Sequence, residues 1–262
     1  MSLTITEIKN ILSTTDYDGL PEVLDGFRAD ERSGVIKLIK QFENKYSAHL
    51  AELKRLEEIT MFEKDLYSKG YKLIAGIDEV GRGPLAGPVV TAAVILPVGC
   101  KIEGVNDSKK LTAHKREELS SIIKEKAVAY AFGMASPIEI DDINILQATY
   151  RAMRKAISAL NPNADFVLAD AVTIPEITVP QRGIIKGDAK SISIGAASII
   201  AKVERDAMMD EYAKIYPEYG FEKNKGYGSA EHIAANALYQ IEVDHVAEVT
   251  FDREMVMKLL EA

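Results

Sequence analysis

Cysteine, histidine and long apolar runs are all scarce in this sequence. The single cysteine, Cys100, has no second cysteine with which to form an intramolecular disulfide, and the polar N-terminus carries no apolar signal segment, so we expect a cytoplasmic protein. No stretch approaches the roughly 20 apolar residues that cross a bilayer, which excludes a membrane-spanning helix. One cysteine and four histidines also leave little material for a zinc site.

The composition otherwise indicates an ordinary globular protein. A chain of 262 residues with 47% hydrophobic content can form one substantial α/β domain and a small accessory region. The net charge of −8 argues mildly against a nucleic-acid-binding protein, because such proteins usually present a basic face to phosphates. A metal-dependent nuclease escapes this argument, since it places carboxylates where cations meet the scissile phosphate. Nothing indicates oligomerisation, and we expect a monomer.

The first 70 residues differ in texture from the rest. They hold many charges and few glycines, with apolar residues at helical spacing at Val35, Leu38, Ile39 and Phe42. Gly70 suits the end of a helix and is our predicted boundary. We therefore expect a helix-rich region over residues 1–70, with a possible role as an accessory substrate-binding surface, and a second domain over 71–262 that includes C-terminal helices.

Strands and helices alternate after Gly70, which predicts an α/β fold with a central sheet flanked by helices. Glycines and prolines in residues 80–88 predict a loop between the first two strands. The predicted strands are 72–78, 89–96, 128–135, 166–170 and 183–186. The predicted helices are 113–127, 137–160, 191–216, 230–239 and 253–260.

Carboxylates stand where these strands end. Asp78 and Glu79 follow an apolar strand, Asp170 ends a second, and Asp188 follows a third. Adjacent carboxylates repel each other unless cations compensate, and hard divalent cations prefer oxygen ligands. Converging acids of this kind can hold two cations that activate water for phosphoryl displacement. The alternative is that each acid is an ordinary solvated turn residue, which for any single aspartate is the commoner case.

Six ordered motifs over most of residues 72–232 make the sequence resemble the type 2 ribonucleases H, specifically bacterial ribonuclease HII. The first begins at Asp78-Glu79 and continues through Gly81-Arg82-Gly83 to Val90. The others are Asp107-Ser108-Lys109-Lys110-Leu111, Asn144-Ile145-Leu146-Gln147-Ala148-Thr149, Lys186-Gly187-Asp188-Ala189-Lys190-Ser191, Ala197-Ser198-Ile199-Ile200-Ala201-Lys202-Val203 and Asn224-Lys225-Gly226-Tyr227-Gly228.

The resemblance implies a ribonuclease H-like fold with a mixed sheet, and an endonuclease that cuts the RNA strand of RNA–DNA hybrids. It also implies cleavage on the 5′ side of ribonucleotides embedded in duplex DNA, leaving 3′-hydroxyl and 5′-phosphate ends, as needed for ribonucleotide or RNA primer removal. The implied catalytic and metal-binding acids are Asp78, Glu79, Asp170 and Asp188. The implied cofactor is Mn²⁺ or Mg²⁺, two ions acting together.

The nucleic-acid contacts are also implied by the resemblance. Gly81, Arg82 and Gly83 resemble the loop that contacts the ribose 2′-hydroxyl, the group that distinguishes RNA from DNA. Tyr227 resembles a tyrosine that packs on a sugar, and the remaining implied contacts are Lys109, Lys110, Arg205 and Ser229. The plainer alternatives are a surface arginine paired with an acid for Arg82, half-buried packing for Tyr227, and solvated lysines.

Two further positions modify the expectation. Asp206 follows Arg205 on a helix, and we rank it below Asp188 as a metal ligand because it can instead orient Arg205 or Lys202. Near the C-terminus the family usually has His-Arg followed by Ser-Phe, whereas this chain has His245-Val246-Ala247-Glu248-Val249-Thr250-Phe251, which puts contacts there in doubt.

Three other functions share these features. They are a related ribonuclease HIII, a catalytically silent hybrid-binding protein on the same fold, and a small-molecule phosphohydrolase that needs no 2′-hydroxyl.

Overall fold

The computed structural model describes residues 3–239, which form two compact units divided between Glu58 and Ile59. The first unit is helical, with α1 (Ile5–Thr14), α2 (Leu20–Phe27) and α3 (Ser33–Ile59). A capping box between Thr4 and Glu7 starts α1. The buried side chains of the three helices form a core of their own: Ile8, Leu12, Leu20, Leu24, Val35, Leu38, Ile39 and Phe42.

The division lies twelve residues before the predicted boundary at Gly70, because the next helix belongs to the second unit. Helix α4 (Met61–Ser68) buries Leu66 in a cluster with Ile74 and Phe166 of the sheet. Gly70 itself has φ +96 and follows the end of α4, as expected of a residue that stops a helix.

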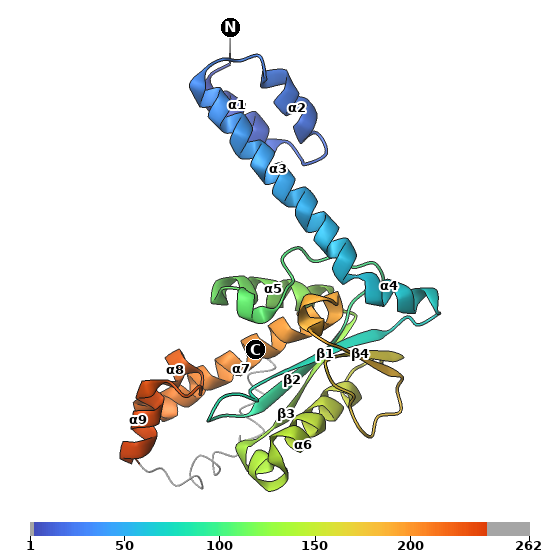
Figure 1. Ribbon diagram of the computed structural model, residues 1–262, viewed down its shortest axis with the longest axis vertical. Helices are drawn as coiled ribbons and strands as arrows, with labels where there is room; N and C mark the ends of the chain where they lie inside the picture. The colour runs from blue at the N-terminus through green and yellow to red at the C-terminus, as the bar shows by residue number, and fades with distance from the viewer. Residues whose placement is uncertain (1–2, 240–262) are drawn as a thin grey trace. The chain divides into compact units, whose positions relative to one another are not determined.

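The second unit is built on a five-stranded mixed sheet of order β3-β2-β1-β4-β5 (Figure 1). The strands are β1 (Ile74–Val80), β2 (Val89–Ile95), β3 (Ala129–Ala135), β4 (Phe166–Asp170) and β5 (Gln181–Ile184). Strand β2 pairs antiparallel with β1 and β3, whereas β4 pairs parallel with β1 and β5. The predicted α/β fold with a mixed sheet is confirmed.

Helices α6 (Pro137–Ser158) and α7 (Ile192–Ile215) cover opposite faces of this sheet (Figure 1). Side chains alternate along β1, so Ala75 and Ile77 pack with the core that includes Met153 of α6, while Ile74 packs with Ile194 of α7. Gly76 also faces α7, where an added Cβ would lie 2.0 Å from the backbone of Ser193.

The remaining helices are shorter. They are α5 (Ala113–Lys126), α8 (Phe221–Asn224), α9 (Ala230–Tyr239) and the 3₁₀ turns η1 (Ser108–Lys110), η2 (Gly187–Ala189) and η3 (Pro217–Tyr219). Among residues 3–239 no helix has the length and apolarity needed to cross a bilayer. The predicted helix at 253–260 and the altered motif at His245 lie outside the described residues.

Candidate active site and nucleic-acid interface

The predicted acids of β1 and β4 lie side by side. These two strands run parallel with Ile77 opposite Ala169, so the next residues, Asp78 and Asp170, come at the same level on neighbouring strands. Asp78 is held from the other side as well, because it is opposite Ala92 on the antiparallel strand β2. The sheet therefore brings together two carboxylates that are 92 positions apart in the sequence.

Asp78 is the most buried of the predicted acids, with 7% exposure. Burial is the main reason that its pKa lies well above the usual range, and the charge of Glu79 adds to this effect. A hydrogen bond with the Ser198 hydroxyl opposes the shift, and the Asp78 Oδ1 accepts a 2.8 Å bond from the Glu79 N–H. Two hydrogen-bonded groups therefore fix the carboxylate on the face of β1 that packs against α7.

Ser198 connects Asp78 to a second predicted motif. Its Oγ lies 3.0 Å from the Oγ of Ser108, and both serines are buried. Ser108 begins η1, whose next residues are the exposed Lys109 and Lys110. This hydroxyl pair places two predicted phosphate-contacting lysines in a loop that is tied, through α7, to the buried acid.

The other acids influence one another through their charges. The pKa of Glu79 is raised mainly by burial, an effect that Arg82 opposes and Asp170 strengthens. The pKa of Asp188 is likewise raised by burial, and then by the charges of Asp107 and Asp170. Mutual repulsion of this kind is what a bound cation would relieve.

Glu79 and Asp170 nevertheless each form a hydrogen bond with a nearby group of the protein. Glu79 Oε1 accepts a 3.1 Å bond from Arg82 Nη1, and Asp170 Oδ1 accepts a 2.6 Å bond from the Gly187 N–H. Among residues 3–239, no three His, Cys, Asp or Glu side chains form a group that could hold a metal ion. The four-acid metal site therefore stays a prediction, with its members on adjacent elements but not gathered around one point.

Asp188 reaches this region in a different way from that predicted. The strand before it ends at Ile184 and not at 186, because its register is set by pairing with β4. Lys186 then adopts a left-handed conformation with φ 59, and Asp188 lies within the 3₁₀ turn η2. Gly187 fits tightly there, since an added Cβ would lie 3.3 Å from the Asp170 Oδ1.

The loop at residues 81–88, which we call the glycine loop, exposes Arg82 and Gly83. Gly81 has φ +105, a backbone conformation that residues other than glycine rarely adopt. The Arg82 side chain is 40% exposed and pairs with Glu79, so the plainer interpretation of a surface arginine beside an acid describes its geometry. Its guanidinium still has donors free to meet a phosphate or a ribose.

Tyr227 stands next to the glycine loop. It is 44% exposed, and an added Cβ on Gly83 would lie 3.7 Å from its ring. Its backbone carbonyl lies 2.9 Å from Nδ1 of the buried His232. This contact fixes the backbone at Tyr227 to the interior. The Ser229 Oγ accepts a bond from the His232 N–H near the start of α9, and its contact with a phosphate stays a prediction.

Arg205 does not fit its predicted contact with a duplex. It is fully buried, and its guanidinium donates to the carbonyls of Pro88, Ala86 and Lys225. Its neighbour Asp206 accepts a 2.6 Å bond from Lys202. This contact agrees with the alternative that Asp206 orients Lys202.

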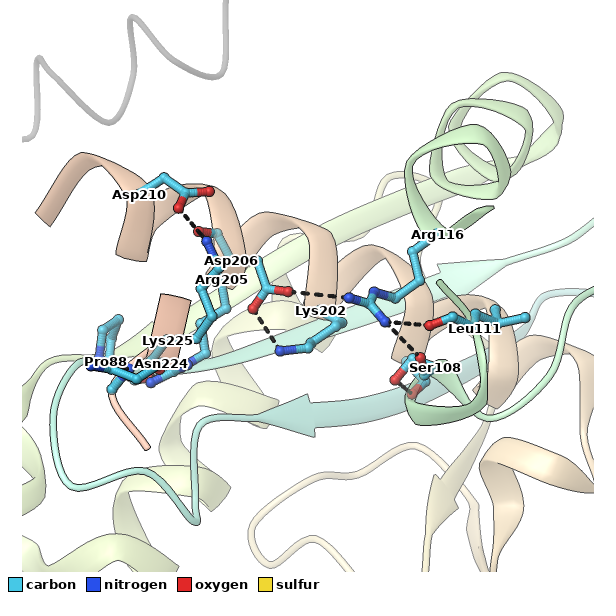
Figure 2. Close-up of polar contacts among 12 residues, drawn as sticks. Pro88, Ser108, Leu111, Arg116, Lys202, Arg205, Asp206, Asp210, Asn224 and Lys225 are labelled. Atoms are coloured by element: carbon cyan, nitrogen blue, oxygen red, sulfur yellow. Dashed lines mark hydrogen bonds and ion pairs between the residues drawn. The ribbon is translucent and has the colours of Figure 1, made fainter. Parts of the chain in front are cut away.

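Arg116 is a residue that the sequence did not single out. It lies 3.7 Å from Asp206 and donates to the carbonyls of Ser108 and Leu111 (Figure 2). Nothing local marks this position, since its partners lie in other elements. Ser108 and Ser198, by contrast, lie within two of the motifs that carry the sequence's resemblance to a known family.

Comparison with known proteins identifies the family. The family described as Ribonuclease HII matches residues 75–253, and the Ribonuclease HII N-terminal domain matches residues 4–67. The chain belongs to the ribonuclease HII family. It is 51% identical over 245 residues to ribonuclease HII of Clostridioides difficile, covering 92% of this chain and 94% of that one.

Solved structures agree on the fold of ribonuclease HII. Ribonuclease H2 of Pyrococcus horikoshii OT3 aligns with a TM-score of 0.55 and 27% identity, covering 67% of this chain and 97% of that one. Bst-RNase HIII, solved in complex with Mn²⁺, aligns with a TM-score of 0.53 and 17% identity over 74% of this chain and 67% of that one, which shows a shared fold alone. Ribonuclease HII cleaves the RNA of RNA–DNA hybrids, so the predicted enzyme class is confirmed and the HIII alternative is not supported.

Proposed function

We propose that this chain cuts the RNA strand of RNA–DNA hybrids and also cleaves on the 5′ side of single ribonucleotides within duplex DNA, leaving 3′-hydroxyl and 5′-phosphate ends. One observation carries the proposal. Asp78 and Asp170 lie at one level on adjacent parallel strands, and the strand that carries Asp78 leads directly into the exposed glycine loop. A centre for phosphoryl chemistry and a sensor for ribose are therefore joined by a few residues of backbone.

The donor chemistry of the acids suits divalent cations, while their side chains are not gathered around one point. They offer only oxygen ligands, which Mg²⁺ and Mn²⁺ prefer, and the pKa values of Asp78, Glu79 and Asp188 are raised by burial and by neighbouring carboxylates. Asp78, Glu79, Asp170 and Asp188 would hold the ions. When bound, two such ions activate water and stabilise the departing 3′-oxygen. Glu79 would exchange its pairing with Arg82 for a cation, which frees the guanidinium for the substrate.

The other residues bind and orient the duplex. The backbone of Gly81 to Gly83 approaches the ribose without side-chain crowding, and the 2′-hydroxyl is the group there that differs between RNA and DNA. The exposed ring of Tyr227 packs on the next sugar. Lys109 and Lys110 are exposed and contact phosphates, which sets the position of the strand without reading its sequence.

Duplexes that carry four, one or no ribonucleotides test this function in Mg²⁺ and in Mn²⁺. We expect cleavage of the first two duplexes and none of the third. A ligase should rejoin the products without further treatment, because they carry 5′-phosphate and 3′-hydroxyl ends. Asp78→Asn and Asp170→Asn should each abolish turnover while duplex binding persists, because the amide keeps the shape of the side chain but loses the charge.

Asp142→Asn is the matched control, since Asp142 is an exposed carboxylate of α6. It should cleave like the unaltered protein. Cleavage of the all-DNA duplex, full activity of Asp78→Asn, or full activity of the unaltered protein in excess chelator would contradict the proposal.

A further inference from the structure

Arg205 is a buried cation that binds only backbone. Arg205 is 0% exposed, and its guanidinium donates from Nε to the Pro88 carbonyl at 2.9 Å, from Nη2 to the Ala86 carbonyl at 3.0 Å and from Nη1 to the Lys225 carbonyl at 2.8 Å. The carboxylate beside it in sequence, Asp206, is engaged with Lys202 and Arg116 instead. Three carbonyls that converge on one guanidinium make a specific binding site for that group.

The three carbonyls come from two loops that both carry predicted substrate contacts. Ala86 and Pro88 belong to the glycine loop, and Lys225 belongs to residues 224–229, which we call the tyrosine loop. The loops also meet directly, because the Gly226 carbonyl accepts a 2.8 Å bond from the Leu85 N–H. Arg205 thus lies beneath a junction whose outer surface exposes Arg82 and Tyr227.

Glycines in both loops pack too closely at this junction to leave room for a side chain. An added Cβ on Gly81 would lie 2.6 Å from Arg205 Nε, and one on Gly87 would lie 3.1 Å from Nη2. A Cβ on Gly226 would lie 2.3 Å from the Ala86 carbonyl oxygen. All three glycines have positive φ. The glycine pattern is therefore explained by packing around Arg205 as well as by access for a substrate.

We propose that Arg205 is a positioning residue that sets the spacing between the glycine loop and the tyrosine loop, and that this spacing selects single ribonucleotides. The inference rests on the proposed function. A duplex with one ribonucleotide presents a 2′-hydroxyl at one place only, so the glycine loop must meet it while Tyr227 packs on the adjoining sugar. In a run of four, a displaced loop still meets a 2′-hydroxyl on a neighbouring nucleotide.

Arg205→Lys tests this reasoning. A lysine keeps the charge but lacks the planar, rigid guanidinium that donates to all three carbonyls at once, so the loops lose their fixed spacing. The measurement is kcat/KM on duplexes with one and with four ribonucleotides. We expect the ratio of the two values to fall about tenfold or more, since a misplacement near 1 Å costs on the order of 100-fold in rate.

Leu119→Ala is the control for lost stability. Leu119 is fully buried in α5 and touches neither loop by hydrogen bond, so this variant should unfold more easily and keep the unaltered ratio. If Arg205→Lys fails to fold, Gly87→Ala disturbs the same junction from the loop side and should lower the ratio in the same direction.

The outcomes separate the two proposals. An unaltered protein that cuts neither duplex refutes the proposed function. A protein that cuts both, with an unchanged ratio in Arg205→Lys or Gly87→Ala, refutes the role of Arg205, as does an equal fall in Leu119→Ala.

Discussion

Replacing Gly76 with alanine should separate β1 from α7 and weaken both the fold and the acid site. Gly76 lies in the strand that carries Asp78, two residues before it and on the same face. An added Cβ would meet the Ser193 carbonyl carbon at 2.0 Å and the Ile194 nitrogen at 2.3 Å. Both atoms are backbone, so neither can rotate away as the end of a flexible side chain would.

The expected cost follows from these distances. A contact at 2.0 Å must lengthen by about 1.4 Å to reach the ordinary 3.4 Å, which requires the start of α7 to move as a body. Overpacking in a core costs about 1–3 kcal/mol. We expect the upper end, about 3 kcal/mol, because backbone gives less than side chains. The same shift carries Ser198 away from Asp78, so turnover should fall as well.

Hydrogen exchange in increasing urea measures this loss in peptides from β1 and α7, which excludes signal from the first unit. Gly26→Ala is the matched control, because Gly26 lies within α2 and no atom is within 4 Å of an added Cβ. It should stabilise the first unit by about 0.5–1 kcal/mol, since alanine favours a helix over glycine. A loss below about 1 kcal/mol in Gly76→Ala would show that α7 is not held by the sheet as described.

Three further predictions concern charge and domain structure. Burial raises the pKa of Glu63, which accepts bonds from Ser191 Oγ and the Ser193 N–H, so its stabilising contribution is full below the ordinary carboxyl range and is lost as pH rises through the raised pKa. As the pH rises from about 4, the ordinary carboxyl range, the free energy of unfolding of Glu63→Gln should therefore increase relative to that of the unaltered protein; a constant or decreasing difference contradicts this. Added Mn²⁺ should raise the free energy of unfolding of the unaltered protein by about 2.7 kcal/mol at 100 times the Kd, and with it the thermal midpoint, and should do far less for Asp78→Asn; equal shifts of the midpoint in the two proteins would count against the cation site. Truncation before Ile59 should leave a cooperatively unfolding second unit with weaker binding to duplexes, whereas truncation after Gly70 should destabilise it by removing α4; unchanged affinity in a titration would refute a substrate-binding role for the first unit.

Elements with strong local signals were predictable from the sequence. Strand β4 spans the predicted 166–170, and α5 begins at the predicted Ala113 because the Thr112 side chain caps its first turn. The predicted helix 137–160 is interrupted at Asn144, which has φ 68 and whose Oδ1 accepts bonds from the N–H groups of Leu146 and Gln147. An asparagine within a polar, helix-compatible stretch gives little warning of such a break.

The residues of the candidate site also include some that the sequence predicts and some whose role depends on the fold. The positions of Asp78, Glu79 and Asp170 could be predicted because these acids stand where apolar strands end, and parallel pairing brings Asp78 and Asp170 together, whereas Asp188 lies in the turn η2 beyond β5. The role of Arg205 could not, because its partners Pro88 and Ala86 lie 117 and 119 positions away and become its environment only when the chain folds. Because Arg205 is a charged residue within a motif, the sequence predicts a substrate contact. Its burial instead places it among the residues that hold the glycine and tyrosine loops.

Strand β1 lies third among five and is hydrogen-bonded along both edges. A strand in that position has little freedom to shift, since displacing its carboxyl end would strain the ladders with β2 and β4 together. Under the proposed function, changes in substrate preference are therefore expected from the glycine and tyrosine loops before the strand. A mutant library meant to alter substrate preference is best confined to those loops, with the sheet left untouched.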